Sequence, residues 1–184
     1  MNAAVLDPAI GYVIAGAFTL LFVHAAIGKW RSIAEFRAVL ENYRLFPPPL
    51  AAPLALIVPA MESAVAVALL GATTRAAAAV AGGTLLLGYA AAIGVNLRRG
   101  RLDLDCGCAG PADRRPIAGW LVWRNILLAA VLAGVIPPWS SRALGWLDLG
   151  TVAGGLVVLV LLYVASDRLL GQVMPRTATL RGAR

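Results

Sequence analysis

The chain has 184 residues, of which 60% are hydrophobic and 14% are charged, and its mean hydropathy is +0.81. A soluble domain is roughly 45–50% apolar, so the composition excludes an ordinary soluble protein and indicates an integral membrane protein. The net charge of +7 does not indicate nucleic-acid binding, because the basic residues lie between apolar segments, where they set topology against anionic membrane lipid. No basic region precedes the first apolar segment, so we expect no cleaved signal peptide.

Stretches of about 20 apolar residues predict transmembrane helices. They lie at about 9–28, 51–72, 76–96, 117–137 and 150–167. The link "TTR" between the second and third stretches is short enough to force an antiparallel helical hairpin. The break "PPWSSRALGWLD" before the last stretch is typical of an interfacial turn, because it combines Pro and Trp.

The segment between the first two spans has its own pattern. Five apolar residues recur there at helical spacing: Ile33, Phe36, Val39, Leu40 and Tyr43. Five charged residues fall mainly on other faces: Arg31, Glu35, Arg37, Glu41 and Arg44. This pattern predicts an amphipathic helix on the membrane surface, which the following prolines end.

Together these elements predict an all-α integral membrane protein, an antiparallel bundle of four core transmembrane helices plus a fifth, C-terminal one. Residues 1–137 would form the four-helix core, 138–167 the interfacial loop and fifth helix, and 168–184 a basic, mostly disordered tail. With the N-terminus outside, thirteen Lys and Arg residues fall on the inner side, against Arg75 and Arg142 outside. The positive-inside rule therefore predicts a multi-pass protein of the inner (plasma) membrane, with a cytoplasmic C-terminus.

Polar residues inside apolar spans are costly, so each is a functional-site hypothesis. The spans or their ends contain His24, Lys29, Glu62, Asn96, Arg124 and Asn125. In an antiparallel bundle these residues fall in the same half of the membrane. Glu62 and Arg124 would form a buried pair that sets helix register, or Arg124 would lower a thiol pKa nearby while Glu62 balances charge or relays a proton. His24 is most simply a packed or interfacial residue, and a proton-relay or ligand role is the alternative.

The two cysteines of the chain, Cys106 and Cys108, stand one residue apart in "RGRLDLDCGCAGPADRR", in a loop that the charge count makes cytoplasmic. Two thiols and a single histidine do not make a structural zinc site. A disulfide across one residue closes a small strained ring, which suits thiol–disulfide exchange, and Gly107 tolerates the backbone angles it needs. A Cu(I) site formed by both thiolates and His24, or two reduced bystander thiols, are the alternatives.

Three stretches carry a resemblance: "GKWRSIAEFRAVLENYRLFPPPLAAPLALIVPAMESAVAVALL", "GVNLRRGRLDLDCGCAG" and "WLVWRNILL". In this order they resemble the MauE family of methylamine utilisation membrane proteins, in the DoxX-like superfamily, over about residues 9–137. The matching site positions are Lys29, Glu62, Cys106, Gly107, Cys108, Gly110, Arg124 and Asn125. Ala109 departs from the pattern, because relatives often carry an aromatic residue there.

The resemblance implies assistance to the biogenesis of methylamine dehydrogenase, whose small subunit carries many disulfides, together with a thioredoxin-like partner. We therefore expect a membrane thiol–disulfide oxidoreductase with Cys106 and Cys108 as redox pair, which supports maturation of an exported client. With only two cysteines, the chain needs a quinone or a partner to carry electrons across the membrane. A non-enzymatic assembly factor, or a carrier of Cu(I), is the alternative.

Overall fold

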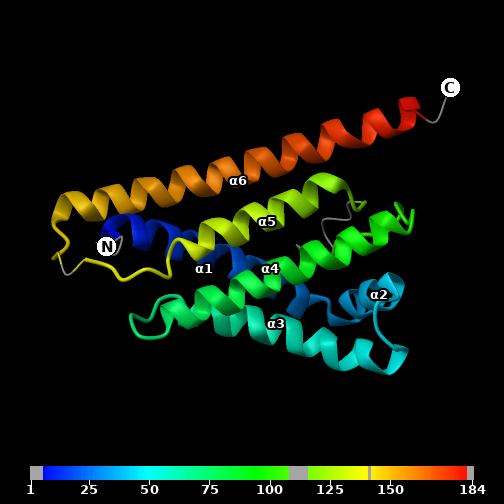
Figure 1. The fold of residues 1–184 in the computed structure, drawn as a ribbon, viewed down its shortest axis with the longest axis horizontal. Helices are drawn as coiled ribbons and strands as arrows, with labels where there is room; N and C mark the ends of the chain where they lie inside the picture. Colours follow the sequence, from blue (N-terminus) through cyan, green and yellow to red (C-terminus); the bar gives the residue numbers. More distant parts are fainter. Residues whose placement is uncertain (1–5, 108–115, 141, 182–184) are drawn as a thin grey trace, which may run out of the picture.

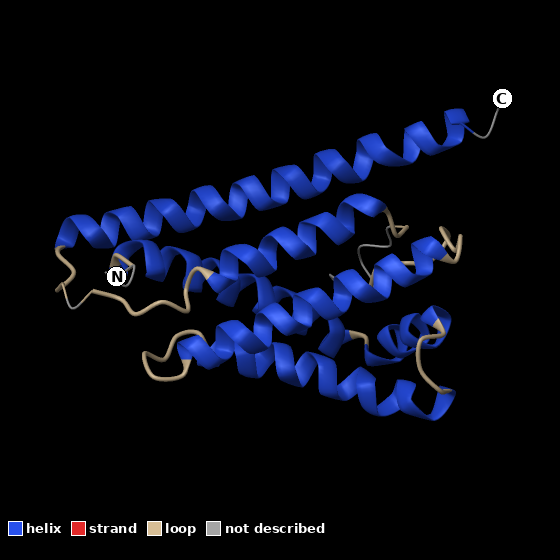
Figure 2. Cartoon of the chain, viewed as in Figure 1, coloured by secondary structure: helices blue, strands red, loops and turns tan. Residues whose placement is uncertain are grey.

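The computed structural model describes residues 6–107, 116–140 and 142–181, with side chains as far as Leu170. Throughout these residues the regular structure is helical (Figures 1 and 2). The elements are α1 (Pro8–Arg31), α2 (Ile33–Tyr43), the 3-10 turn η1 (Pro48–Leu50), α3 (Ala51–Ala68), α4 (Arg75–Arg98), α5 (Gly119–Ala133) and α6 (Trp146–Arg181). The predicted all-α class is confirmed.

Four of these helices are long and apolar enough to cross a membrane. They are Pro8–Arg31, Pro48–Ala68 with the 3-10 turn included, Arg75–Arg98 and Trp146–Leu170. The predicted span 117–137 is a shorter apolar helix, because α5 has only 15 residues and gives way to turns at Gly134. At about 1.5 Å per residue, α5 is about 22 Å long, less than the roughly 30 Å of a bilayer core.

The helix predicted between the first two spans is present as α2, and its two faces divide as expected. Phe36 and Tyr43 are buried, and the other apolar residues of the stripe are partly buried, while the five charged residues listed above are exposed. The buried face packs on the protein itself, chiefly on α3. The amphipathic pattern therefore covers one end of the bundle, and its placement on a membrane surface stays a prediction.

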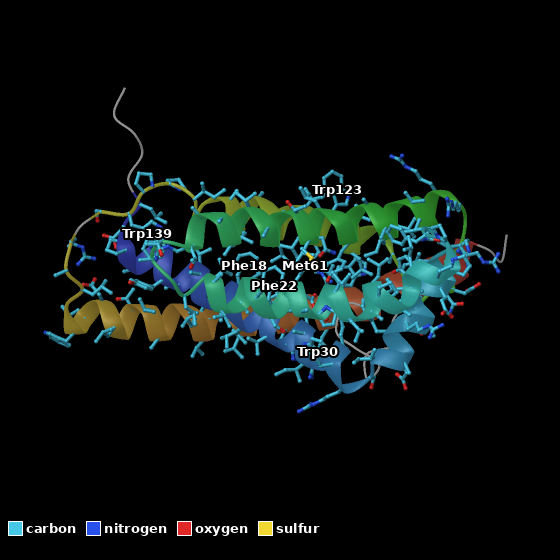
Figure 3. The ribbon with its side chains drawn as sticks, turned by 90° about the horizontal axis from the view of Figure 1, so that it is seen from below. Phe18, Phe22, Trp30, Met61, Trp123 and Trp139 are labelled. Carbon is cyan, nitrogen blue, oxygen red and sulfur yellow. The ribbon has the colours of Figure 1, made fainter. Side chains whose placement is uncertain are left out.

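The centre of the bundle is a cluster of buried apolar side chains from α1, α3, α4 and α5. Phe18 and Phe22 of α1 lie in the middle, as Figure 3 shows, whereas Trp123 of α5 projects from the outer surface. Gly82 of α4 allows close packing, because a Cβ there would lie 2.9 Å from Leu132 and 3.0 Å from the ring of Phe22. This core aligns the helices that carry the buried polar residues.

The N-terminus and the α5–α6 loop meet at one end of the bundle (Figure 1). Leu6 exchanges backbone hydrogen bonds with Pro138 and Ser140, and the Trp139 ring lies 3.1 Å from the guanidinium carbon of Arg75. The exposed guanidinium of Arg142 bridges Asp7 and Asp148. The predicted Pro- and Trp-containing turn is therefore held to the N-terminus and to Arg75 by specific contacts, at the opposite end of the bundle from the α4–α5 loop.

The last helix, α6, packs on α1, where glycines permit close approach. A Cβ at Gly16 would lie 2.9 Å from Leu156, and a Cβ at Gly155 would lie 2.9 Å from Val13. We expected residues 168–184 to be mostly disordered, but α6 continues as helix to Arg181. Leu169 and Leu170 favour this continuation, but the helix also passes through Gly171 and Pro175, for which local helix propensity gives no reason.

Candidate functional site

Three polar side chains meet inside the bundle, one each from α1, α3 and α4. The ammonium of Lys29 donates to both carboxylate oxygens of Glu62, at 2.8 Å and 3.0 Å. The hydroxyl of Tyr89 donates to Glu62 Oε1 at 2.6 Å. Lys29 and Glu62 are both 0% exposed. We call Lys29, Glu62 and Tyr89 the buried triad.

The pairing of Glu62 with Arg124 that the sequence suggested is wrong. Glu62 faces α1 and α4 and pairs with Lys29, whereas Arg124 on α5 pairs with Asp167 of α6 at 2.5 Å. The physical reason is the rotation of each side chain about its helix axis: Arg124 points toward α6, where it contacts Asp167 and Tyr163. The position of a residue along an apolar span does not show toward which neighbouring helix its side chain points.

Aromatic rings surround both cationic groups. The Lys29 ammonium lies 5.4 Å from the ring centroids of Phe36 and Tyr89, close enough for cation–π attraction. The Arg124 guanidinium lies 5.3 Å from Trp120 and 5.9 Å from Tyr163. Its Nε is buried without a hydrogen-bond partner, which is costly inside an apolar bundle. Phe36 belongs to α2, so α2 connects the buried triad to the end of the bundle.

The cysteine loop lies at that end, between α4 and α5. Cys106 is disulfide-bonded and partly buried against an apolar cluster that includes Tyr43, Ile93 and Ile117. A backbone hydrogen bond from Ile117 N to Leu104 O, 2.8 Å long, joins the two described sides of the loop. The predicted site positions Cys108 and Gly110, and the departing Ala109, lie outside the described residues.

Gly107 occupies a place that other residues fit poorly. Its φ is +65°, in the left-handed region that favours glycine. A Cβ there would lie 2.9 Å from Cγ1 of Val39 on α2. The prediction that Gly107 supplies unusual backbone freedom agrees with this geometry, and the close approach to α2 is an additional reason for a glycine.

Two arginines at the end of α4 and the start of the cysteine loop hold α2. Arg101 donates to the carbonyl of Tyr43 at 3.3 Å and to Asn96 Oδ1 at 3.1 Å, and Arg99 donates to the carbonyl of Arg44 at 3.2 Å. These carbonyls end a helix that has no basic residue of its own in its last turn, where a cation is stabilising. The arginines therefore fix α2 over the loop and keep positive charge there.

The two predicted asparagines are buried, each on its own helix. Asn96 Nδ2 donates to Ala92 O at 3.1 Å, and Asn125 Nδ2 donates to Leu121 O at 2.8 Å. Asn96 contacts the loop end through Arg101. Asn125 faces the interior with 2% exposure. Both amides satisfy the carbonyl one turn earlier, which stabilises a polar group inside an apolar helix.

His24 is exposed and belongs to a different face of α1 from the buried triad. It lies two residues from each of the buried Phe22 and Ala26, and two residues correspond to about 200° around a helix. Among the residues that the structure describes, no group of three metal-binding side chains is found. The alternative Cu(I) site needs Cys108, which is outside them, so it stays a prediction.

Sequence reasoning missed Tyr89 and Arg101 as site residues and treated Tyr43 only as part of an apolar stripe. Tyr89 carried a signal, because a hydroxyl in the middle of an apolar span needs a partner. Tyr43 and Arg101 carried none that could be read from spacing, since their roles depend on α2 folding back over the end of α4.

Apolar helices of membrane-spanning length, a buried ion pair between them and a disulfide-bonded cysteine loop at one end define a class: a multi-pass helical membrane protein with a cysteine loop capping its bundle. The family model described as methylamine utilisation protein MauE matches residues 7–138. The chain belongs to the MauE family, which confirms the resemblance seen over about residues 9–137.

Curated relatives extend the match beyond the core. The chain is 34% identical over 176 residues to the methylamine utilization protein MauE of Paracoccus denitrificans, with 94% of each chain covered. It is 38% identical over 167 residues to the MauE protein of Methylorubrum extorquens, with 89% of each chain covered. No solved structure matches the chain.

Proposed function

We propose that the protein is a membrane thiol–disulfide oxidoreductase that uses Cys106 and Cys108 as its redox pair. The observation that carries the proposal is the disulfide-bonded state of Cys106 in a loop held against α2. The positive φ of Gly107 supports it, because a short ring between neighbouring cysteines needs such a residue. Strain of this kind favours exchange over permanent cross-linking.

The proposed reaction is an exchange of two electrons. A thiolate of the client attacks one sulfur of the Cys106–Cys108 disulfide, the sulfur–sulfur bond breaks, and a mixed disulfide forms. The second client thiolate displaces the chain's sulfur, so the client gains a disulfide and the chain is left with two thiols. Two electrons and two protons then pass to an acceptor, the disulfide of a thioredoxin-like partner or a quinone, which restores the chain's disulfide.

The arginines at the loop end would support this exchange electrostatically, whereas the buried triad, in which Glu62 balances the charge of Lys29, would support it by holding α2 in place. Lys29 lies against Phe36 of α2, and α2 in turn contacts the loop through Val39. Arg101, held at the same end, keeps a cation near the thiolate that forms on reduction. Arg124 is less suited to this role than the sequence suggested, because Asp167 balances its charge.

The client and the membrane side belong to the proposal too. The relatives are named for methylamine utilization, and we infer an exported client of the methylamine-dehydrogenase type, matured at the inner membrane. Disulfides form outside the cytoplasm, whereas the positive-inside rule puts the loop inside. A cytoplasmic loop would exchange with a cytoplasmic thiol partner, as one stage of a relay completed by a quinone or another protein.

The test is differential thiol labelling in intact cells. Membrane-permeant and impermeant maleimides are applied before and after reduction, and the mass shift counts free thiols. We expect the wild type to label at two sites only after reduction, and Cys106→Ser and Cys108→Ser each to lose exchange while still inserting in the membrane. Gly88→Ala serves as a matched control, because a Cβ at Gly88 has no neighbour within 4 Å.

Two results would contradict the proposal. Thiols that stay reduced under every condition would favour metal binding or scaffolding, and exchange retained in either serine variant would exclude a dithiol mechanism. The impermeant reagent reports the side: protection until the cells are opened indicates a cytoplasmic loop.

A further inference from the structure

We propose that Tyr43 is a positioning residue of the cysteine loop, whose hydroxyl holds the carbonyl of Cys106 and so favours the disulfide form of the loop. The inference rests on the proposed function and adds a residue to it. The contact itself is a hydrogen bond of 3.3 Å from Tyr43 Oη to Cys106 O, between residues 63 positions apart in the chain. It joins α2 directly to the redox loop.

The phenol ring of Tyr43 is well placed to act as a fixed anchor. Its residue is 6% exposed and packs in the apolar cluster with Ile93 of α4 and Trp120 of α5. Its own backbone carbonyl accepts from Arg101, which also donates to the fully buried Asn96. The side chain and the backbone of Tyr43 are thus both held, one by the core and the other by the end of α4.

Tyr43 and Val39 contact consecutive residues of the loop, Cys106 and Gly107. They stand four positions apart on α2, so they lie on one face of the helix. Val39 meets Gly107 at the point where a Cβ would clash, and Tyr43 meets the Cys106 carbonyl immediately before it. The peptide between Cys106 and Gly107 is therefore fixed at two adjacent points, next to the sulfur that carries the disulfide.

The hydroxyl keeps its proton over the whole working range of pH. Burial, and then the negative charge of Asp105, raise the pKa of Tyr43 well above its usual value. The phenol accordingly remains a donor and does not become an anion beside the loop. Tyr43→Phe removes this donor and leaves the buried ring in place.

The bond occurs in the disulfide-bonded form, so its loss is expected to weaken that form relative to the dithiol. At 3.3 Å the bond is long for a hydroxyl donor, and we expect a shift of about threefold in the equilibrium constant toward the dithiol. For a two-electron couple, a threefold change corresponds to a potential about 14 mV less negative.

The experiment equilibrates the full-length protein, reconstituted in lipid nanodiscs, with glutathione buffers of graded thiol-to-disulfide ratio. Acid quenching and maleimide labelling then give the fraction in the disulfide form. Tyr43→Phe is compared with the wild type and with Tyr12→Phe, the same chemical change at the opposite end of the bundle, where Tyr12 packs edge-on against Trp139. We expect the threefold shift in Tyr43→Phe and no shift in Tyr12→Phe.

A second variant, at Arg101, tests the anchoring of Tyr43 through its backbone carbonyl. Arg101→Lys keeps the positive charge, but a lysine lacks the planar guanidinium that bridges Tyr43 O and Asn96. We expect Arg101→Lys to shift the equilibrium toward the dithiol by less than Tyr43→Phe does. In the double variant Tyr43→Phe with Arg101→Lys, the shift should be smaller than the sum of the two single shifts, because both changes loosen the same loop. A shift in the opposite direction would contradict the anchoring role.

The outcomes separate the two proposals. A wild type without reversible oxidation overturns the proposed function and, with it, the role of Tyr43. A wild type that titrates normally, with Tyr43→Phe unchanged or with Tyr12→Phe shifted equally, overturns the inference about Tyr43 and leaves the redox pair standing.

Discussion

Removing either member of the Lys29–Glu62 pair is expected to destabilise the bundle strongly, whereas neutralising both is expected to cost far less. The two side chains are 1% and 0% exposed, and they face each other at 2.8 Å. Loss of one partner leaves an uncompensated charge inside the bundle, which costs about 3–5 kcal/mol. Lys29→Met and Glu62→Gln should therefore each lower the free energy of unfolding by about this amount.

The double variant tests the physical reason. Lys29→Met with Glu62→Gln leaves no buried charge, and the glutamine keeps an oxygen to accept from Tyr89. Replacement of a buried ion pair by neutral groups of similar volume is often close to neutral, so we expect a total loss of about 1–3 kcal/mol instead of the roughly 6–10 kcal/mol that additivity requires.

The assay is equilibrium unfolding in mixed micelles of a mild detergent and dodecyl sulfate, followed by tryptophan fluorescence. Tyr89→Phe belongs to the same series: it removes a hydrogen bond to a charged acceptor and should cost about 1.5–3 kcal/mol. Gly88→Ala, one residue from Tyr89 and open at its Cβ, is the matched control. Additive losses in the Lys29/Glu62 double variant would refute the reasoning, because they would mean that the charges do not stabilise each other.

Two further predictions concern the ends of the bundle. Gly107→Ala should lower the free energy of unfolding by about 1–2 kcal/mol, because alanine is strained in the left-handed backbone conformation. Added to that variant, Val39→Ala should recover only the part of the loss that comes from the clash with Val39, as thermal unfolding can measure. Full recovery would contradict a contribution from the backbone. The hydrogen bond from Arg142, aided by that from Ala9 N, lowers the pKa of Asp7 below its usual 3.8. Because the folded-state pKa is the lower one, the stabilisation is complete above pH 3.8 and is lost as the pH falls through the folded-state pKa. Thermal midpoints between pH 6 and pH 2 should fall less steeply for Asp7→Asn than for the wild type, and parallel curves would contradict this.

Local pattern was enough to predict the helices, because a bilayer-length apolar run and an amphipathic stripe constrain the chain residue by residue. The structure has α1, α3 and α4 close to the predicted ranges, and α6 begins near its predicted start but continues past residue 167 to Arg181. The stripe of α2 has Phe36 and Tyr43 buried, as its pattern predicted. The span of α5 was overestimated, since Gly134 and the prolines after it are apolar in composition and end the helix all the same.

The partners within the site were harder to predict, because each depends on rotation about a helix axis. The sequence suggested a pair between Glu62 and Arg124, yet their side chains point to different neighbours, Lys29 and Asp167. The role of Tyr43 depends on how α2 folds back onto α4, a contact across more than 50 residues. Neither composition nor spacing contains that information.

The amphipathic stripe of α2 also allowed two placements, and the sequence does not choose between them. A stripe of this kind lies equally well on lipid or on protein. The structure uses it on protein, where Phe36 contacts the buried lysine and Val39 contacts the cysteine loop. The stripe therefore contacts the residues of the candidate site, and the placement of α2 on a membrane surface stays a prediction.

The brevity of α5 has a consequence for the surrounding lipid. Its 15 residues fall about 8 Å short of an average hydrocarbon core. The turns after it are shielded by protein only in part: Val135 is 1% exposed and Trp139 packs on Arg75, whereas Gly134, Ile136 and Pro138 are exposed. Irregular backbone is tolerated inside the hydrocarbon region only where protein or water covers it, so these turns favour the edge of a thin bilayer. The bilayer beside α5 would become thinner to match the short helix. A change in bilayer thickness would therefore act directly on α5, the helix that follows the cysteine loop.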